Sequence, residues 1–416
     1  MSTPRVKVKA KIKASAVFAP LLPGSLIDGQ VATLGVMGGG QLGRMFVHAA
    51  QALGYRTAVL EPDAASPAGL VSHVHVQTAY LDENGLAQLA RASHAITTEF
   101  ENVPAAALLA LAKTRPVAPA ASAVTIAQDR AAEKAHFDRC GVPCAPYALI
   151  DSNAQLNMVD ASLLPGILKT TRMGYDGKGQ ARVKNRAELA AAWNALKQVP
   201  CVLEKRLALA SECSVVVARG QDGTCVNLPL QRNTHRDGIL AVTEVYKSGL
   251  PSSIEKQAIN AAKSIASELQ YVGVLCVEFF VVQDGDRDKP RLVVNEIAPR
   301  PHNSGHWSMN ACDVSQFELQ VRALAGLPLM QPRQTGPAIM LNLLGDIWPD
   351  KGSVKWDKLL AVPGTHLHLY GKTEARAGRK MGHLNITGKT VADVQATALK
   401  AAKLLGIKPL AHWAKP

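Results

Sequence analysis

Two glutamates lie in apolar runs on either side of a short polar segment. Glu278 belongs to "VGVLCVEFFVV", Glu296 belongs to "RLVVNEIAPRPHNSGH", and "QDGDRDKP" separates the two runs. Such runs joined by a polar turn predict a β-hairpin. Both glutamates are nine residues from Arg287, so a hairpin symmetric about that residue places them opposite each other. Opposed carboxylates in apolar surroundings repel unless a cation lies between them, and Mg²⁺ bound also to substrate phosphates is the natural cation. The alternative is a shifted register that leaves one glutamate in solvent.

The loop after Glu296 concentrates polar side chains between prolines. "APRPHNSGHW" contains Arg300, His302, Asn303, Ser304 and His306. For either histidine alone, a structural role is the better explanation. Because the loop follows the acid pair directly, we interpret it as part of a site.

A glycine-rich turn follows the first apolar strand. "VATLGVM" runs into "GGGQLGRMFVHAAQALG" and then "RTAVLEPD"; Gly38, Gly40 and Gly43 satisfy G-x-G-x-x-G, and Glu61 ends the second strand. This strand, turn, helix and strand predict a dinucleotide site or, more broadly, a phosphate held by backbone N–H groups at a helix N-terminus. A tight turn with only a structural role is the alternative.

A later apolar segment, "HAITTEFENVP", ends in Glu99 and Glu101. We expect both at the sheet edge where doubly wound folds bind ligands, although either could be a solvated loop charge.

A second glycine-rich turn carries cations. In "GILKTTRMGYDGKGQARV" a strand containing Lys169 leads to a turn and returns as a strand. Glycine N–H groups and lysine ammonium groups both reach phosphate oxygens, so this tip suits a lid over polyphosphate. An ordinary exposed hairpin is the alternative. The turn consists of Gly174, Tyr175, Asp176, Gly177, Lys178 and Gly179.

Composition excludes several classes of protein. The 416 residues are 47% hydrophobic and 19% charged and contain no run of 18 apolar residues, so we expect two or three globular domains and no membrane partner. The seven cysteines, an odd number without a CxxC pair, fit neither a disulfide framework nor a zinc site and indicate a reducing compartment.

The net charge of +13 lies at the two ends of the chain. Residues 1–30 carry +4 and residues 351–416 carry +9, so residues 31–350 are neutral. Aromatic residues are only 5% and do not interleave with the basic ones, so we expect no nucleic-acid partner and favour small phosphate anions. Residues 1–30 are predicted to be a basic, disordered tail, with a transit peptide as the alternative.

Together these motifs resemble the ATP-grasp ligases and, within them, the N5-carboxyaminoimidazole ribonucleotide synthetase family. The resemblance covers about residues 31–409 and follows the order of the family's blocks: "GGGQLGRM", "TEFENVP", "GYDGKGQ", "NEIAPRPHNSGH", "SQFELQVRALAGLPL" and "YGKTEARAGRKMGH". It implies an α/β ATP-grasp fold. Its parts would be a doubly wound, Rossmann-like N-terminal domain (31–128), an ATP-grasp region (129–335) and a small β-rich C-terminal domain (336–416) with a late helix.

The resemblance also assigns residues to ligands. ATP would contact Arg130, Lys169, Gly174, Tyr175, Asp176, Gly177, Lys178, Gly179, Glu204, Lys205, Leu207, Glu212, His235, Asn295 and Glu296. Mg²⁺ would be held by Glu278 and Glu296. The aminoimidazole ribonucleotide would contact Gly39, Gly40, Gln41, Leu42, Glu99, Asn303, Ser304, Lys372, Arg379 and Lys380. The residues expected nearest the chemistry are Tyr175, Asp176, Arg300 and His302.

Three positions depart from the family pattern. Ala298 stands where many ATP-grasp enzymes have an asparagine, Met173 replaces a usual glycine, and Arg232 replaces an acid. These departures concern a second metal ion, the lid and the surroundings of His235.

The implied reaction joins ATP, bicarbonate and 5-aminoimidazole ribonucleotide through carboxyphosphate in purine biosynthesis, in a cytoplasmic homodimer. A formate-using glycinamide ribonucleotide transformylase is the near alternative, and Gln41 and "HNSGH" argue against it. An NAD(P)-dependent oxidoreductase would leave the opposed glutamates unexplained. A non-catalytic nucleotide sensor would not need the two metal-binding glutamates, and both are present.

Overall fold

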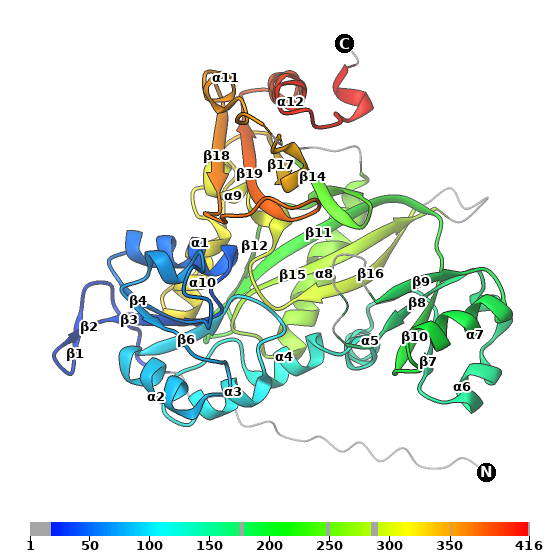
Figure 1. Ribbon diagram of the computed structural model, residues 1–416, viewed down its shortest axis with the longest axis horizontal. Coiled ribbons are helices and arrows are strands. Elements are labelled where there is room, and N and C mark those ends of the chain that lie inside the picture. Colours follow the sequence, from blue (N-terminus) through cyan, green and yellow to red (C-terminus); the bar gives the residue numbers. More distant parts are fainter. Residues whose placement is uncertain are drawn as a thin grey trace.

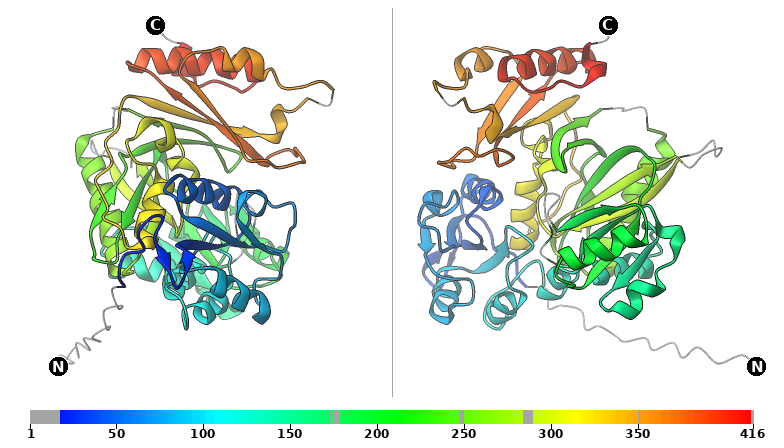
Figure 2. Two further views of the ribbon diagram at one scale, coloured as in Figure 1. Left: turned by 90° about the vertical axis from the view of Figure 1, so that its left-hand side faces the viewer. Right: turned by 45° about the vertical axis from the view of Figure 1, so that its right-hand side comes forward.

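The computed structural model describes residues 18–172, 174, 179–246, 250–283, 290–349 and 351–414. Its strands form a two-stranded ribbon, two four-stranded sheets and one nine-stranded sheet. Figure 1 shows the N-terminal sheet at the left, the smaller grasp sheet at the right and the large sheet between them, with the C-terminal strands of the large sheet at the top; Figure 2 gives two further views. None of the described helices is long and apolar enough to cross a bilayer.

The N-terminal sheet is parallel and lies between helices, as the sequence predicts for a doubly wound domain. Its order is β5 (Val74–Val76), β4 (Arg56–Leu60), β3 (Thr33–Met37) and β6 (Ala95–Thr98). All five residues of β3 are buried because helices cover both faces of the sheet. The accompanying helices are α1 (Gln41–Ala52), α2 (Glu83–Ala92), α3 (Ala105–Leu111) and α4 (Ala121–Ala127).

The predicted solvated tail is wrong for its second half. Strands β1 (Leu26–Ile27) and β2 (Gln30–Val31) form a small antiparallel ribbon. The N–H of Leu21 donates to the carbonyl of Ala325 at 2.9 Å, and its carbonyl accepts from the Tyr55 hydroxyl at 2.5 Å. Apolar contact and these bonds therefore attach the segment to the first domain and to the end of the helix Gln316–Ala325, whereas residues 1–17 lie outside the described part.

The smaller grasp sheet carries the predicted cationic hairpin. It is antiparallel, in the order β7 (Tyr147–Ile150), β10 (Cys201–Lys205), β8 (Gly166–Thr170) and β9 (Gln180–Val183). Helices α6 (Asn153–Met158) and α7 (Arg186–Ala195) accompany it. Of the turn between β8 and β9, residues 173 and 175–178 lie outside the described residues.

The large sheet joins the grasp region to the C-terminal segment. Its order is β16 (Arg291–Ala298), β15 (Gly273–Val282), β11 (Leu209–Arg219), β13 (Gln231–Arg236), β14 (Ile239–Val245), β17 (Ala338–Leu344), β19 (Lys380–Thr387) and β18 (Thr365–Leu369), with β12 (Cys225–Asn227) paired to β11. Because β14 pairs with β17, the C-terminal strands continue the grasp sheet.

Helices cover this sheet at several places. The helix after the first domain is α5 (Arg130–Arg139), capped by the Asp129 side chain. The predicted late helix is α12 (Val391–Leu405), which begins with a capping box at Thr390. The others are α8 (Ser252–Glu268), α9 (Ser308–Ala311), α10 (Gln316–Ala325) and α11 (Trp356–Leu360). The domain limits near residues 128 and 335 stay predictions.

Three histidines stack where the loop after β16 meets the C-terminal strands. The ring of His383 lies 4.7 Å from that of His306 and 4.6 Å from that of His368. Burial, and next the neighbouring imidazoles, hold the pKa of His383 well below its usual value. Burial, followed by His366, lowers the pKa of His368 from 6.5 to about 4. The cluster is therefore packed in its neutral form.

We predict that this cluster makes the fold sensitive to acid. A folded-state pKa below the unfolded value means that the unfolded chain binds more protons, so stability is lost as the pH falls from 6.5 toward 4. His368 alone, which is partly exposed, should contribute about 1 kcal/mol of this loss by pH 5. Thermal midpoints measured from pH 7 to pH 5 should fall less steeply in His368→Gln than in the parent, and parallel curves would contradict this assignment.

Candidate active site

The first glycine loop is filled by carboxylates of the chain itself. Gly40 and Gly43 donate their N–H groups to the two oxygens of Glu99 at 2.6 and 2.7 Å, and Gly39 donates to Glu61 at 2.8 Å. The expectation that these N–H groups are open to a phosphate is therefore wrong for this structure. A Cβ at Gly40 would collide with the Glu99 carboxylate, so the glycine is needed for this close approach.

Glu99 is buried at the carboxyl edge of the N-terminal sheet. Burial raises the pKa of its carboxyl, while the hydrogen bonds from Gly43 and Gly40 lower it. The neighbouring Glu101 forms an ion pair with Arg300 of the loop after β16. The two acids predicted at this edge thus face the site from the first domain.

Replacing Glu99 with glutamine tests this arrangement. Glutamine has one acceptor oxygen, so its NH₂ group would face a buried backbone N–H, and the free energy of unfolding should fall by about 1–3 kcal/mol. Glu83→Gln, which changes an exposed residue in the first turn of α2, is the matched control. The thermal midpoint should drop for Glu99→Gln alone. Equal midpoints for the two variants would show that the loop does not depend on the carboxylate.

The predicted glutamate pair is confirmed by the register of the hairpin. Glu278 of β15 pairs with Glu296 of β16, and the register then shifts so that Phe279 pairs with Val294. Asn295 is the extra residue of this β-bulge, and its side-chain oxygen is buried without a hydrogen-bond partner. Directly paired residues share one face of a sheet, so both carboxylates lie on the same side.

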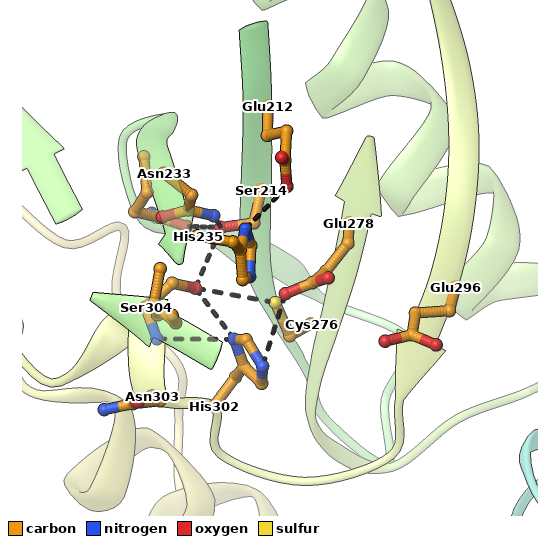
Figure 3. A network of polar contacts seen from close by, with 12 residues as sticks. Glu212, Ser214, Asn233, His235, Cys276, Glu278, Glu296, His302, Asn303 and Ser304 are labelled. Atoms are coloured by element: carbon orange, nitrogen blue, oxygen red, sulfur yellow. Dashed lines mark hydrogen bonds and ion pairs between the residues drawn. The ribbon is translucent and has the colours of Figure 1, made fainter. Parts of the chain in front are cut away.

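The electrostatics of the pair are those of two like charges. Burial, and next the charge of Glu296, raise the pKa of Glu278 to about 7. Arg130 contacts Glu296 at 3.0 Å between Nη1 and Oε2, and His302 Nε2 lies 3.4 Å from Glu278 Oε1. Figure 3 shows these two glutamates with the polar residues beside them. One cationic and one imidazole group thus lie beside the acid pair in the absence of ligands.

Behind His302 lies a buried chain of polar side chains (Figure 3). Its Nδ1 is 2.9 Å from the Ser304 hydroxyl, which is 2.8 Å from the hydroxyl of Ser214 on β11. Asn233 Nδ2 donates to that Ser214 hydroxyl at 2.8 Å. This chain fixes the orientation of the imidazole toward Glu278.

Three residues predicted to contact the substrate have side chains that are occupied within the fold. The Asn303 and Asn342 side chains donate to each other, the first at 3.0 Å, and Ser304 is fully buried. Leu42 packs against Phe317 and Tyr370. Contacts of these residues with substrate therefore stay predictions for their backbone groups only.

The nucleotide side of the site is built on the smaller sheet. Lys169 of β8 contacts Glu204 Oε2 at 2.8 Å, and Lys134 of α5 contacts the other oxygen, also at 2.8 Å. Although burial would raise it, Lys169 and Lys134 lower the pKa of Glu204 to about 2. Both carboxylate oxygens are engaged, so a nucleotide contact by Glu204 would come from its backbone.

The structure also describes other residues that are predicted to contact the nucleotide. Lys205 ends β10, and Leu207 lies in the connection to β11. Glu212 of β11 lies 2.5 Å from His235 Nδ1, and against the effect of burial this partner raises the pKa of His235. Gly174 and Gly179 are described, whereas Tyr175, Asp176, Gly177 and Lys178 lie outside the described residues.

The basic C-terminal residues reach the same region. Lys380 begins β19. Against the effects of burial and Glu296 it lowers the pKa of Glu278. Against the effect of burial, Arg300 and then Lys380 lower the pKa of Glu101. Lys372 donates to the Lys380 carbonyl at 2.7 Å, and Arg379 donates to the Glu374 carbonyl at 2.9 Å. Gln41 begins α1 on the opposite domain.

Sequence reasoning missed Lys134 and Glu133. Lys134 is 1% exposed and Glu133 is 3% exposed. Glu133 accepts the Ile297 N–H at 2.7 Å, next to Glu296. Both follow Arg130 within helix α5. The spacing of four residues between Arg130 and Lys134, which places them on one helix face, was the available indication.

Comparison with known families agrees with this geometry. Three family models match: the ribonucleotide synthetase preATP-grasp domain over residues 31–128, the ATP-grasp domain over 135–317, and the phosphoribosylaminoimidazole carboxylase C-terminal domain over 338–397. The fold, the paired glutamates and these matches define an ATP-grasp ligase.

Similar proteins identify the family within the ATP-grasp ligases to which this chain belongs. The N5-carboxyaminoimidazole ribonucleotide synthase of Brucella melitensis is 44% identical over 85% of this chain and 95% of that protein, and the Bacillus subtilis enzyme of the same name is 38% identical over 85% and 90%. The chain belongs to the N5-carboxyaminoimidazole ribonucleotide synthase family. This membership decides against the oxidoreductase and transformylase alternatives.

Solved structures of similar proteins show the same fold. An ADP complex of an N5-carboxyaminoimidazole ribonucleotide synthetase has a TM-score of 0.83 at 36% identity, covering 93% of this chain and 97% of that one. The Aspergillus clavatus synthase in complex with ADP and 5-aminoimidazole ribonucleotide has a TM-score of 0.81 at 30% identity, covering 90% and 98%.

Proposed function

We propose that this chain carboxylates 5-aminoimidazole ribonucleotide to N5-carboxyaminoimidazole ribonucleotide in purine biosynthesis, using ATP and bicarbonate. The observation that carries the proposal is the opposed pair of Glu278 and Glu296 in a chain of this family. The relative solved with ADP and 5-aminoimidazole ribonucleotide supports the choice of ATP and acceptor.

The acid pair suits Mg²⁺. Its donors are carboxylate oxygens, which this hard cation prefers. Burial and then the charge of Glu296 raise the pKa of Glu278, and a bound cation would offset both effects. In the part of the chain that the structure describes, no group of three or more His, Cys, Asp or Glu could hold a metal alone. We therefore propose that Glu278 and Glu296 hold Mg²⁺ together with ATP phosphates, whose charge Mg²⁺ neutralises when bound.

The reaction then divides into two transfers. A bicarbonate oxygen attacks the γ-phosphorus of ATP, the bond to ADP breaks, and carboxyphosphate forms. The exocyclic amine of the ribonucleotide then attacks the carboxyl carbon of carboxyphosphate, or the CO₂ that carboxyphosphate releases. Phosphate leaves with the electrons of the broken C–O bond, and the nitrogen loses a proton. Lys169 would stabilise charge on the phosphates, while Arg300 and His302, which lie beside Glu101 and Glu278, would contact the carboxyl group during its transfer. Tyr175 and Asp176 stay predictions.

A phosphate-release assay tests this function. ATP, bicarbonate and 5-aminoimidazole ribonucleotide are supplied together and each is omitted in turn. We expect fast phosphate release, matched by carboxylated product, only with all three. Equal rates without the ribonucleotide and no product would rule the function out.

Removing one charge of the acid pair should stop ATP turnover. Glu296→Gln is nearly isosteric and relieves the repulsion with Glu278, so the fold should remain intact while ADP formation falls by at least about 100-fold. Glu374→Gln, which alters a carboxylate 67% exposed and paired with Arg376, is the matched control. Near-normal ADP formation by folded Glu296→Gln would end the metal assignment.

The basic C-terminal loop is proposed to bind the ribonucleotide phosphate. A charged hydrogen bond to phosphate contributes roughly 1.5–3 kcal/mol, so Arg379→Ala should raise the ribonucleotide KM about tenfold to a hundredfold and leave the ATP KM unchanged. Arg376→Ala, in the same loop but paired with Glu374 and 69% exposed, should change neither. Equal weakening of both substrates by Arg379→Ala would mean that the loop supports the whole cleft.

We also propose that the enzyme is a homodimer that works in the cytoplasm, as the family resemblance implies. All seven cysteines are free thiols, which supports a reducing compartment.

A further inference from the structure

Helix α5 lies between the two sheets of the grasp region (Figure 1). At its first turn Arg130 contacts Glu296, and Glu133 accepts the Ile297 N–H, so this end is attached to β16 of the large sheet. Strand β16 carries one half of the proposed metal site. One helix thus holds the strand on which the metal carboxylate stands.

The same helix is attached to the smaller sheet through Lys134. Its ammonium lies 2.8 Å from Glu204 Oε1 on β10 and 5.5 Å from the centre of the Tyr147 ring on β7. The second Glu204 oxygen holds Lys169 of β8. Glu204 is therefore shared by a lysine of the helix and a lysine of the sheet.

The exposed fractions of the Lys134 and Lys169 side chains differ, and this difference distinguishes their roles. The Lys134 side chain is 1% exposed and that of Lys169 is 11% exposed. Lys134 is too deeply enclosed to touch a ligand, whereas part of the Lys169 side chain is accessible. The charges of Lys134, Lys169 and Glu204 sum to +1, and Lys169 is the lysine whose positive charge is accessible.

We propose that Lys134 is a positioning residue for ATP: by occupying one oxygen of Glu204 it keeps Lys169 directed at the nucleotide and fixes the smaller sheet relative to Glu296. This inference rests on the proposed function in so far as Lys169 binds ATP. Without Lys134, both Glu204 oxygens are available to Lys169, whose ammonium then turns away from the cleft. The distance from the phosphate-binding sheet to the metal carboxylates is no longer set by this ion pair.

Lys134→Met tests the proposal, since methionine keeps most of the apolar length and removes the charge. We expect the ATP KM and the ADP dissociation constant to rise about tenfold, the ribonucleotide KM to stay the same, and Lys134→Arg to recover part of the loss. The matched control is Arg139→Met, which removes an exposed cation from the last turn of the same helix and should alter none of these values. A purely structural role would lower the thermal midpoint without separating the two substrates.

An unchanged ADP dissociation constant in folded Lys134→Met would overturn the proposal. If that variant does not fold, Lys134→Met combined with Glu204→Gln removes one positive and one negative charge together; this variant should fold and bind ADP about tenfold more weakly, and normal ADP binding would again overturn the proposal. ADP binding is measured by calorimetry without the carboxylation reaction. A parent protein that binds ADP but forms no carboxylated product would therefore contradict the proposed function and leave this inference standing.

Discussion

The like charges of Glu278 and Glu296 are the constraint on which the site depends. The hairpin register forces the two carboxylates onto one face, and burial of Glu278, followed by the charge of Glu296, raises the pKa of Glu278 to about 7. Arg130 and His302 each reach one of the carboxylates. The site is therefore poised for a cation and for the anionic ligand that completes the cation's coordination.

Other parts of the fold bring ligand-binding groups to this pair. Helix α5 connects it to the smaller sheet with Lys169, and the continuation of the large sheet into β17, β19 and β18 brings Lys380 close to it. Reciprocal hydrogen bonds between Asn303 and Asn342 attach the loop after β16 to the C-terminal strands. The elements proposed to bind the nucleotide and the ribonucleotide are thus both positioned relative to this hairpin.

Local patterns predicted the first strand, turn, helix and strand, the hairpin and the acid pair because those features depend on neighbouring residues, whereas the ATP-grasp fold class was implied by the family resemblance. The bulge at Asn295 was not predictable from symmetry, yet it leaves Glu278 and Glu296 paired. The glycine loop was misinterpreted because Glu99, which fills it, comes from a strand 56 residues after Gly43. Long-range partners of this kind, including the Lys134 and Glu204 pair, depend on how the sheets pack together.

The most direct test of the acid pair is Mn²⁺ binding, followed by electron paramagnetic resonance with Mn²⁺ in place of Mg²⁺. Because only two carboxylates are present and no third metal-binding side chain joins them among the described residues, the account predicts weak binding to the protein alone and much tighter binding when ADP is added. Glu296→Gln should abolish the tightening. Mn²⁺ binding that is equally tight without ADP, or unaffected by Glu296→Gln, would contradict a metal site shared between these glutamates and the nucleotide.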